Sequence, residues 1–164
     1  MPKLEDLNRL NPEEFTIKVA PAFEHSPWVA ARTAAHRPFQ SLAELHAALC
    51  RTVDQAHPDE KLALIRAHPD LGDTRGITPA SRSEQASAGL DHASPAEMEE
   101  LRENNRRYRE RFGFPFVICA RENKKDAIQR GLTERLQNSR AQEVETALQE
   151  IYKIADHRLH DLVR

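Results

Sequence analysis

The chain has 164 residues, which fits one domain spanning 1–164. Its 39% apolar and 30% charged residues and its net charge of -2 give no electrostatic basis for binding nucleic acid or an anionic membrane. No stretch reaches the ~20 apolar residues of a membrane span, and the acidic start MPKLEDLNRLNPEEF lacks the apolar core of a signal peptide. Cys50 and Cys119 lie in apolar contexts, so we expect two buried, reduced thiols and a cytoplasmic protein.

Helix-start signals recur along the chain, mostly as a capping residue followed by proline. The successive starts are Asn11-Pro12-Glu13-Glu14, Ser26-Pro27, Ser41 with Glu44 as a capping box, His57-Pro58-Asp59-Glu60, Thr78-Pro79 and Ser94-Pro95-Ala96-Glu97. We expect the Thr78 helix to end near Gly89 and the Ser94 helix to run to Phe112. Two further helices are predicted over 125–137 and 140–163, and the last carries a long amphipathic stripe.

Strand signals are nearly absent, with one exception in FGFPFVICA, residues 112–120. Pro115 cannot lie inside a helix without breaking it, so we expect an extended, buried crossing segment. Its backbone N–H and C=O groups must then bond protein, water or a ligand. The predicted fold is all-α: a single-domain irregular bundle of about eight helices with this one extended segment.

Three polar residues share one face of the helix that starts at Pro79. Ser81, Glu84 and Gln85 are spaced i, i+3 and i+4. Such a face is either ordinary solvent surface, which composition alone favours, or the polar wall of a pocket. By the same reasoning, His68 in RAHPDLGDTRG reads locally as a turn residue, and Arg158 on the last helix reads as a surface charge.

Metal and thiol chemistry receive little support from the sequence. His157 and His160 are spaced i, i+3 on the last helix, but no neighbouring carboxylate or thiol completes a familiar ligand set, so no metal site is predicted. Neither cysteine has a charged neighbour that would lower its pKa, which argues against a nucleophilic thiol.

Four motifs occur in order: AHPDLG, SRSEQASAGLD, FGFPFVICA and DHRLHDLV. Together they resemble the 2-oxo-4-hydroxy-4-carboxy-5-ureidoimidazoline (OHCU) decarboxylase family, and the resemblance spans almost the whole chain. It implies decarboxylation of this small-molecule substrate to (S)-allantoin in urate degradation, without a cofactor, by a homodimer. The stretch between His68 and Ser81 is shorter than expected for many family members.

The resemblance also implies the roles of the site residues. His68 would be the general acid/base, and Glu84 would hydrogen-bond its imidazole. Arg158 would anchor an anionic group of the substrate, with His157 as an alternative polar group on that helix. The remaining implied substrate-binding residues are Pro69, which shapes the pocket wall, Ser81, Gln85, and the backbone of Phe116, Val117, Ile118, Cys119 and Ala120.

Two other functions remain open at this point. The long terminal helix could dock a partner in a non-enzymatic helical interaction module, which would leave the polar face of Ser81, Glu84 and Gln85 without a purpose. Alternatively, the protein could decarboxylate a related heterocycle, which substrate profiling would distinguish.

Overall fold

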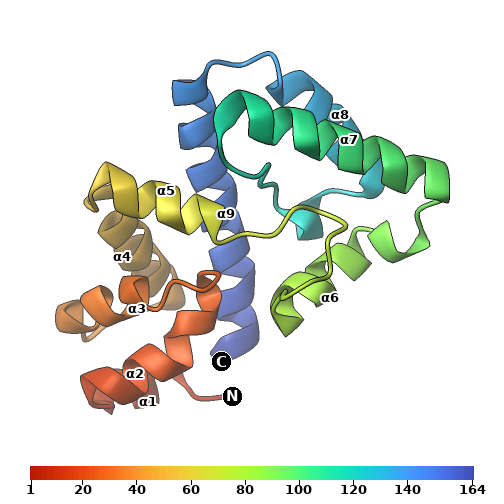
Figure 1. Ribbon diagram of the computed structural model, residues 1–164. Helices are drawn as coiled ribbons and strands as arrows, with labels where there is room; N and C mark the ends of the chain where they lie inside the picture. Colours follow the sequence, from red (N-terminus) through yellow and green to blue (C-terminus); the bar gives the residue numbers. More distant parts are fainter. The chain divides into compact units, whose positions relative to one another are not determined.

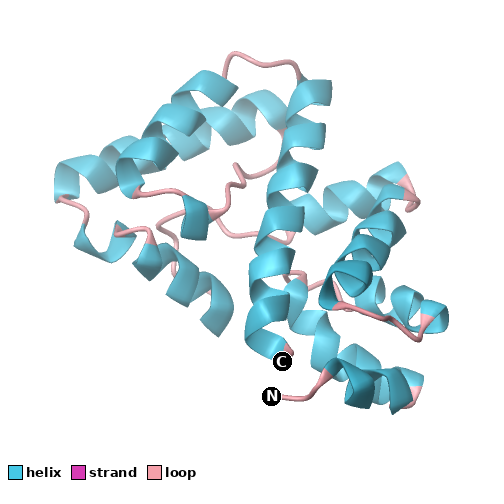
Figure 2. Ribbon diagram, turned by 180° about the vertical axis from the view of Figure 1, so that it is seen from behind, coloured by secondary structure: helices cyan, strands magenta, loops and turns pink.

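The computed structural model describes residues 1–164 and contains helices and loops but no strand (Figures 1 and 2). No helix is both long enough and apolar enough to cross a membrane. The α-helices are α1 (Leu4–Arg9), α2 (Pro12–Val19), α3 (Trp28–Thr33), α4 (Leu42–Asp54), α5 (Pro58–Arg66), α6 (Pro79–Ser87), α7 (Pro95–Phe112), α8 (Lys125–Arg135) and α9 (Arg140–Leu162). Four short 3-10 helices lie at Ala20–Ala22, Ala34–His36, Leu90–His92 and Ala120–Glu122. The all-α prediction is confirmed.

The chain forms two compact units. The first comprises Met1–Ala67 with Tyr152–Arg164, and the second comprises His68–Ile151. Helix α9 contributes its first half to the second unit and its second half to the first. The single-domain organisation expected from the sequence stays a prediction.

The first unit holds α1 to α5 around an apolar core that includes Phe15, Phe39 and Leu45. Helix α3 packs against both α2 and α4. Helices α2 and α4 start at the predicted caps: the Asn11 side chain accepts from Glu14 N at 2.9 Å, and the Ser41 hydroxyl accepts from Glu44 N at 3.0 Å. Helix α3 begins near Ser26-Pro27 but has no side-chain cap, because the Ser26 hydroxyl donates to Glu24 O at 2.8 Å instead. The predicted capping box at Ser41 is incomplete, because the Glu44 carboxylate accepts from Gln40 N at 2.6 Å instead.

One helix in this unit is missing from the sequence prediction. Eight α-helices begin at or near predicted starts, and the ninth is α1, which follows Lys3. Lysine is not a typical capping residue, so its start carries no familiar signal. The N-terminus of α1 is instead capped by a residue inside the helix, because the Asp6 carboxylate accepts from Lys3 N at 3.1 Å.

The second unit has an aromatic core that connects α7 to the crossing segment, residues 112–120. The Tyr108 ring lies 4.5 Å from that of Phe112 and 5.4 Å from that of Phe116, between centroids. Gly113 ends α7 in the left-handed conformation, with φ 79°, as a helix C-terminus favours. From there the chain runs extended and largely buried, which confirms the crossing segment. Helices α7 and α8 pack against each other beside it (Figure 1).

Candidate active site

Helix α6 presents the polar face that the sequence predicts. Thr78 caps the helix by accepting from Ser81 N at 3.2 Å, and Pro79 fills the first helical position. The face is buried: Ser81 and Glu84 are 6% exposed and Gln85 is 7% exposed. A solvent surface is therefore excluded for these residues, and a buried polar face fits the wall of a binding site.

Glu84 faces an arginine that the sequence analysis did not single out. Arg121 Nε lies 3.8 Å from Glu84 Oε2, and Arg121 belongs to the 3-10 helix Ala120–Glu122, which contacts α6. Arg121 directly follows the crossing segment in sequence, and that position was the only available signal for it.

His68 begins the loop between α5 and α6, which we call the His68 loop (residues 68–78). The side chain is buried, with 7% of its surface exposed, and Pro69 beside it is half-buried. Gly72 and Gly76 adopt positive φ values of 89° and 66°, which lets the chain turn twice after His68. The loop thus has the sharp turns that the sequence predicts, and His68 is not an exposed turn residue.

The His68 loop is bonded directly to the polar face of α6. Gly72 N donates to Gln85 Oε1 at 3.0 Å. Gln85 also lines a pocket of about 430 Å³, together with Gly72, Arg82 and Leu90. The same side chain can therefore hold the loop through its oxygen and offer its NH2 group to a ligand.

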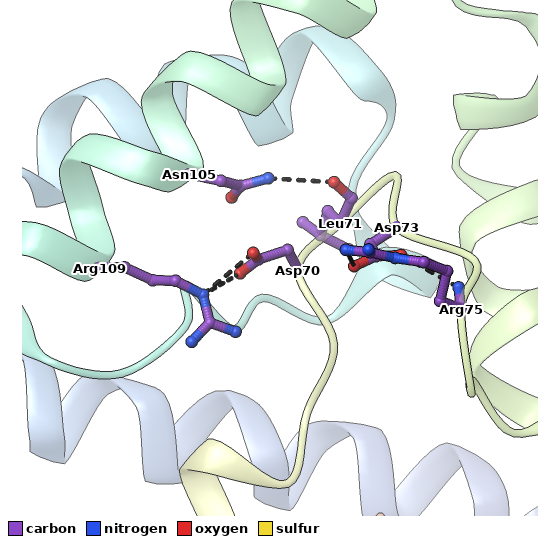
Figure 3. Close-up of polar contacts among 6 residues, drawn as sticks. All are labelled: Asp70, Leu71, Asp73, Arg75, Asn105 and Arg109. Carbon is purple, nitrogen blue, oxygen red and sulfur yellow. Dashed lines mark hydrogen bonds and ion pairs between the residues drawn. The ribbon is translucent and has the colours of Figure 1, made fainter.

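Two contacts fasten the same loop to α7 (Figure 3). Arg109 Nε donates to Asp70 Oδ1 and Oδ2 at 2.8 and 3.0 Å, and Asn105 Nδ2 donates to Leu71 O at 3.0 Å. Asp70 accepts from Asp73 N through its carbonyl at 3.0 Å, and its carboxylate belongs to the ion pair with Arg109.

The crossing segment is buried at every predicted site residue except Ile118, which is half-buried. Several of its backbone groups bond within the protein: Val117 O accepts from Arg135 Nη1 at 2.7 Å, and Cys119 N donates to Glu150 Oε1 at 3.1 Å. Cys119 O accepts from Asn123 Nδ2 at 2.9 Å. These bonds fix the position of the segment. They also leave fewer of its backbone groups available to hydrogen-bond a substrate.

A buried charged network supports the segment, and the sequence analysis did not identify it. Arg135 Nε donates to Glu143 Oε1 at 2.7 Å, Asn138 Nδ2 donates to Glu143 Oε2 at 2.9 Å, and Tyr108 donates to Glu143 Oε1. Burial, followed by the bond to Glu143, raises the pKa of Tyr108 above its usual range. The Arg135 guanidinium also lies 4.4 Å from the ring centroid of Phe116.

Cys119 is buried, as the sequence predicts, but Cys50 is only half-buried, so the prediction of two buried thiols is wrong for Cys50. Both thiols are poor nucleophiles, as the sequence predicts. Burial raises the pKa of Cys119 to about 12, with a further contribution from Glu122. Burial likewise raises the pKa of Cys50 to about 12, with contributions from Asp54 and Asp156. A thiol is reactive as its thiolate, so neither side chain suits nucleophilic catalysis at neutral pH.

Arg158 lies in the other compact unit, and it is not the surface charge that its position on α9 suggested. It is 3% exposed, and it donates through Nη2 to Glu24 Oε2 at 3.0 Å and through Nη1 to Pro21 O at 3.2 Å. The guanidinium is therefore paired with a carboxylate inside the protein, and the anion-binding role of Arg158 stays a prediction.

Comparison with known proteins places the chain in a family. The family model described as OHCU decarboxylase matches residues 8–160. A 2-oxo-4-hydroxy-4-carboxy-5-ureidoimidazoline decarboxylase from Haloferax volcanii is 44% identical over 156 residues, covering 95% of this chain and 93% of that protein.

Two solved structures are similar as well. A crystal structure of (S)-allantoin synthase superposes with a TM-score of 0.83 at 27% identity, covering 100% of this chain and 54% of that one, so this chain spans about half of that protein. A crystal structure of OHCU decarboxylase in the presence of (S)-allantoin gives a TM-score of 0.73 at 27% identity, covering 91% of this chain and 96% of that one. The chain belongs to the OHCU decarboxylase family.

Proposed function

We propose that this protein decarboxylates 2-oxo-4-hydroxy-4-carboxy-5-ureidoimidazoline to (S)-allantoin in urate degradation. The observation that carries the proposal is the buried polar face of Ser81, Glu84 and Gln85, bonded to the loop that begins with His68. Membership of the family supplies the reaction, and the similar structure determined with (S)-allantoin supplies the product class.

The substrate itself can accept the electron pair that decarboxylation releases. Its carboxylate and hydroxyl share one ring carbon, which adjoins a C=N group. When the bond to the carboxylate breaks, CO2 leaves and the electron pair passes to that C=N group, which acts as the electron sink. The ring carbon and the former imine carbon then share a double bond, and the nitrogen takes up a proton. As the hydroxyl loses its proton and becomes a C=O group, the former imine carbon gains a proton on a single face, which gives the S product. The protein's task is to orient the scissile bond and move protons, so we propose a reaction without a cofactor.

The proton transfers fall to His68 and Glu84 in this proposal. His68 accepts the proton of the substrate hydroxyl and assists delivery to carbon, since imidazole exchanges protons near neutral pH. Glu84 orients the imidazole and stabilises its charged form. Burial of both side chains supports the assignment, because excluding water strengthens such interactions.

The other site residues that the resemblance implies are assigned to substrate binding. Ser81 and the NH2 group of Gln85 hydrogen-bond polar edges of the ring, and Pro69 shapes the wall next to His68. Phe116 to Ala120 contact the ring and the ureido arm. Arg158 binds an anionic group, as the resemblance implies.

We also propose that the protein acts as a homodimer in the cytoplasm. The family resemblance supports the dimer, and two free thiols, Cys50 and Cys119, fit a reducing compartment. Light scattering on the purified protein would give the mass of a dimer, whereas the mass of one 18.7 kDa chain would contradict the dimer.

The activity is tested by circular dichroism. Urate oxidase and hydroxyisourate hydrolase generate the intermediate from urate, and (S)-allantoin formation is followed with and without this protein. Because the intermediate also decays unaided, the expected signature is a faster reaction with an optically pure product. A rate and optical signal equal to the uncatalysed control would contradict the proposal, and turnover of a different heterocycle alone would redirect it to that substrate.

A further inference from the structure

Two residues of the His68 loop are bonded to α7, close after His68 in sequence. The Asp70 carboxylate accepts from Arg109, and the Leu71 carbonyl accepts from Asn105 (Figure 3). Arg109 and Asn105 are one helical turn apart, so they lie on the same face of α7. This face of α7 is therefore placed to fix the backbone that leads away from His68.

The two contacts differ in strength because they differ in burial. The side chains of Arg109 and Asp70 are 45% and 27% exposed, so water and salt weaken their attraction. Asn105 is 3% exposed, and water cannot easily replace its bond to Leu71. The hydrogen bond from Asn105 to Leu71 therefore holds the loop more strongly than the ion pair between Arg109 and Asp70 does.

The other polar atom of Asn105, Oδ1, also indicates that the bond from Nδ2 to Leu71 O is what this residue contributes. Its Oδ1 is buried and has no hydrogen-bond partner. A buried unpaired oxygen destabilises the fold, and an apolar side chain of similar size at this position would avoid it. The feature that an apolar residue would lack is the donor Nδ2, which bonds Leu71 O at 3.0 Å.

We propose that Asn105 is a positioning residue for the reaction: by binding Leu71 O it holds the His68 loop, and through the loop it holds the imidazole of His68 in place for proton transfer. The inference rests on the proposed function, because it takes His68 as the acid/base. A displacement of about 1 Å at a reacting group can slow a reaction on the order of 10²-fold. Asn105 then influences the rate without touching the substrate.

The test uses Asn105→Leu and a matched control, Asn104→Leu. Leucine has the same branching at Cγ as asparagine and removes the donor, and Asn104 is the adjacent, half-buried residue of α7. In the circular dichroism assay, Asn105→Leu is expected to lower kcat on the order of 10²-fold with a much smaller change in KM. Asn104→Leu is expected to keep the wild-type kcat.

A second measurement reports on the loop without relying on activity. Arg75 lies in the His68 loop with a side chain that is 90% exposed, so trypsin can cleave after it once the loop opens. Mass spectrometry of brief digests should show faster cleavage at Arg75 in Asn105→Leu than in Asn104→Leu. Equal rates of cleavage at Arg75 in the two variants would overturn the proposal that Asn105 holds the loop, even if Asn105→Leu were too unstable for kinetics.

The outcomes separate this inference from the proposed function. If the wild-type protein does not accelerate (S)-allantoin formation, the proposed function fails, while the cleavage comparison still tests the fastening. If the wild type is active and Asn105→Leu keeps the wild-type kcat, the positioning role is overturned. A rise in KM alone would also overturn it, because that result would indicate lost substrate binding rather than a displaced imidazole.

Discussion

Gln85 Oε1 accepts a hydrogen bond from Gly72 N at 3.0 Å, so a side chain assigned to substrate binding also holds the His68 loop. The two ends of the carboxamide can therefore have different tasks. The oxygen is committed within the protein, and the NH2 group is the end that could bind the substrate. Substitutions that change one end at a time can separate the two tasks.

Replacing Gln85 with Glu keeps an acceptor for Gly72 N and removes the NH2 donor. We expect Gln85→Glu to raise KM with a smaller change in kcat, because the loop stays bonded while a substrate contact is lost. Gln85→Ala removes both and should also lower kcat. Steady-state kinetics by circular dichroism measures both values. Identical kinetics for the two variants would contradict the division of tasks.

Gly72 is required by both its backbone and its surroundings. At φ 89° a side chain is strained, and an added Cβ would lie 2.8 Å from Met98 Cε. We expect Gly72→Ala to destabilise the protein by about 1–3 kcal/mol in urea unfolding and to lower kcat by displacing the loop. Gly76→Ala is the matched control, since an added Cβ there meets nothing within 4 Å. An equal effect of the two variants on kcat would argue that only backbone strain matters.

The buried pair of Arg135 and Glu143 should dominate the stability of the second unit. Arg135→Met would leave the fully buried Glu143 carboxylate without its cation, and breaking such a pair typically costs about 3–5 kcal/mol. Urea unfolding should show this loss, whereas Arg106→Met, which breaks only exposed pairs with Glu103 and Glu110, should change little. A stability near that of the wild type for Arg135→Met would contradict this account.

Alkaline pH should destabilise the fold through its thiols. Burial raises the pKa values of Cys50 and Cys119 from 9.0 to about 12, so the unfolded chain loses these protons first. Their contribution to stability is complete below pH 9 and is lost as the pH rises toward 12. We expect Tm to fall between pH 9 and 11, and to fall less in the Cys50→Ala/Cys119→Ala variant. Equal slopes for the two proteins would contradict the raised pKa values.

The same pKa shifts predict how the thiols react. In the folded protein at pH 8, iodoacetamide should label Cys50 and Cys119 far more slowly than in urea, because little thiolate is present and, at Cys119, burial also limits access. Mass spectrometry after timed quenching measures both rates. Rapid labelling of the folded protein would show that the thiols are accessible and ionised.

The helices could be predicted largely from local signals. Thr78, Ser94 and Asn11 cap their helices as the sequence indicated, because capping involves residues only a few positions apart. Helix α1 was missed since Lys3 is not a capping residue, and the box at Ser41 was wrong because Glu44 bonds Gln40 instead. Only the second error comes from a choice among nearby backbone donors.

The site could be predicted only in part. Spacing placed Ser81, Glu84 and Gln85 on one face, but their burial depends on residues distant in sequence, such as Arg121 beside Glu84. No local pattern predicts that Asn105 bonds Leu71, because the two are 34 residues apart. Long-range packing therefore determines which polar residues become a site.

The roles of His68 and Glu84 are the central claim, and one measurement tests them most directly. The rate of (S)-allantoin formation is followed by circular dichroism for the wild type, His68→Asn and Glu84→Gln, with folding of each variant checked by its helical signal. We predict that His68→Asn lowers kcat on the order of 10²–10⁴-fold, and that Glu84→Gln lowers it as well. Folded variants that form (S)-allantoin at the wild-type rate would contradict the account.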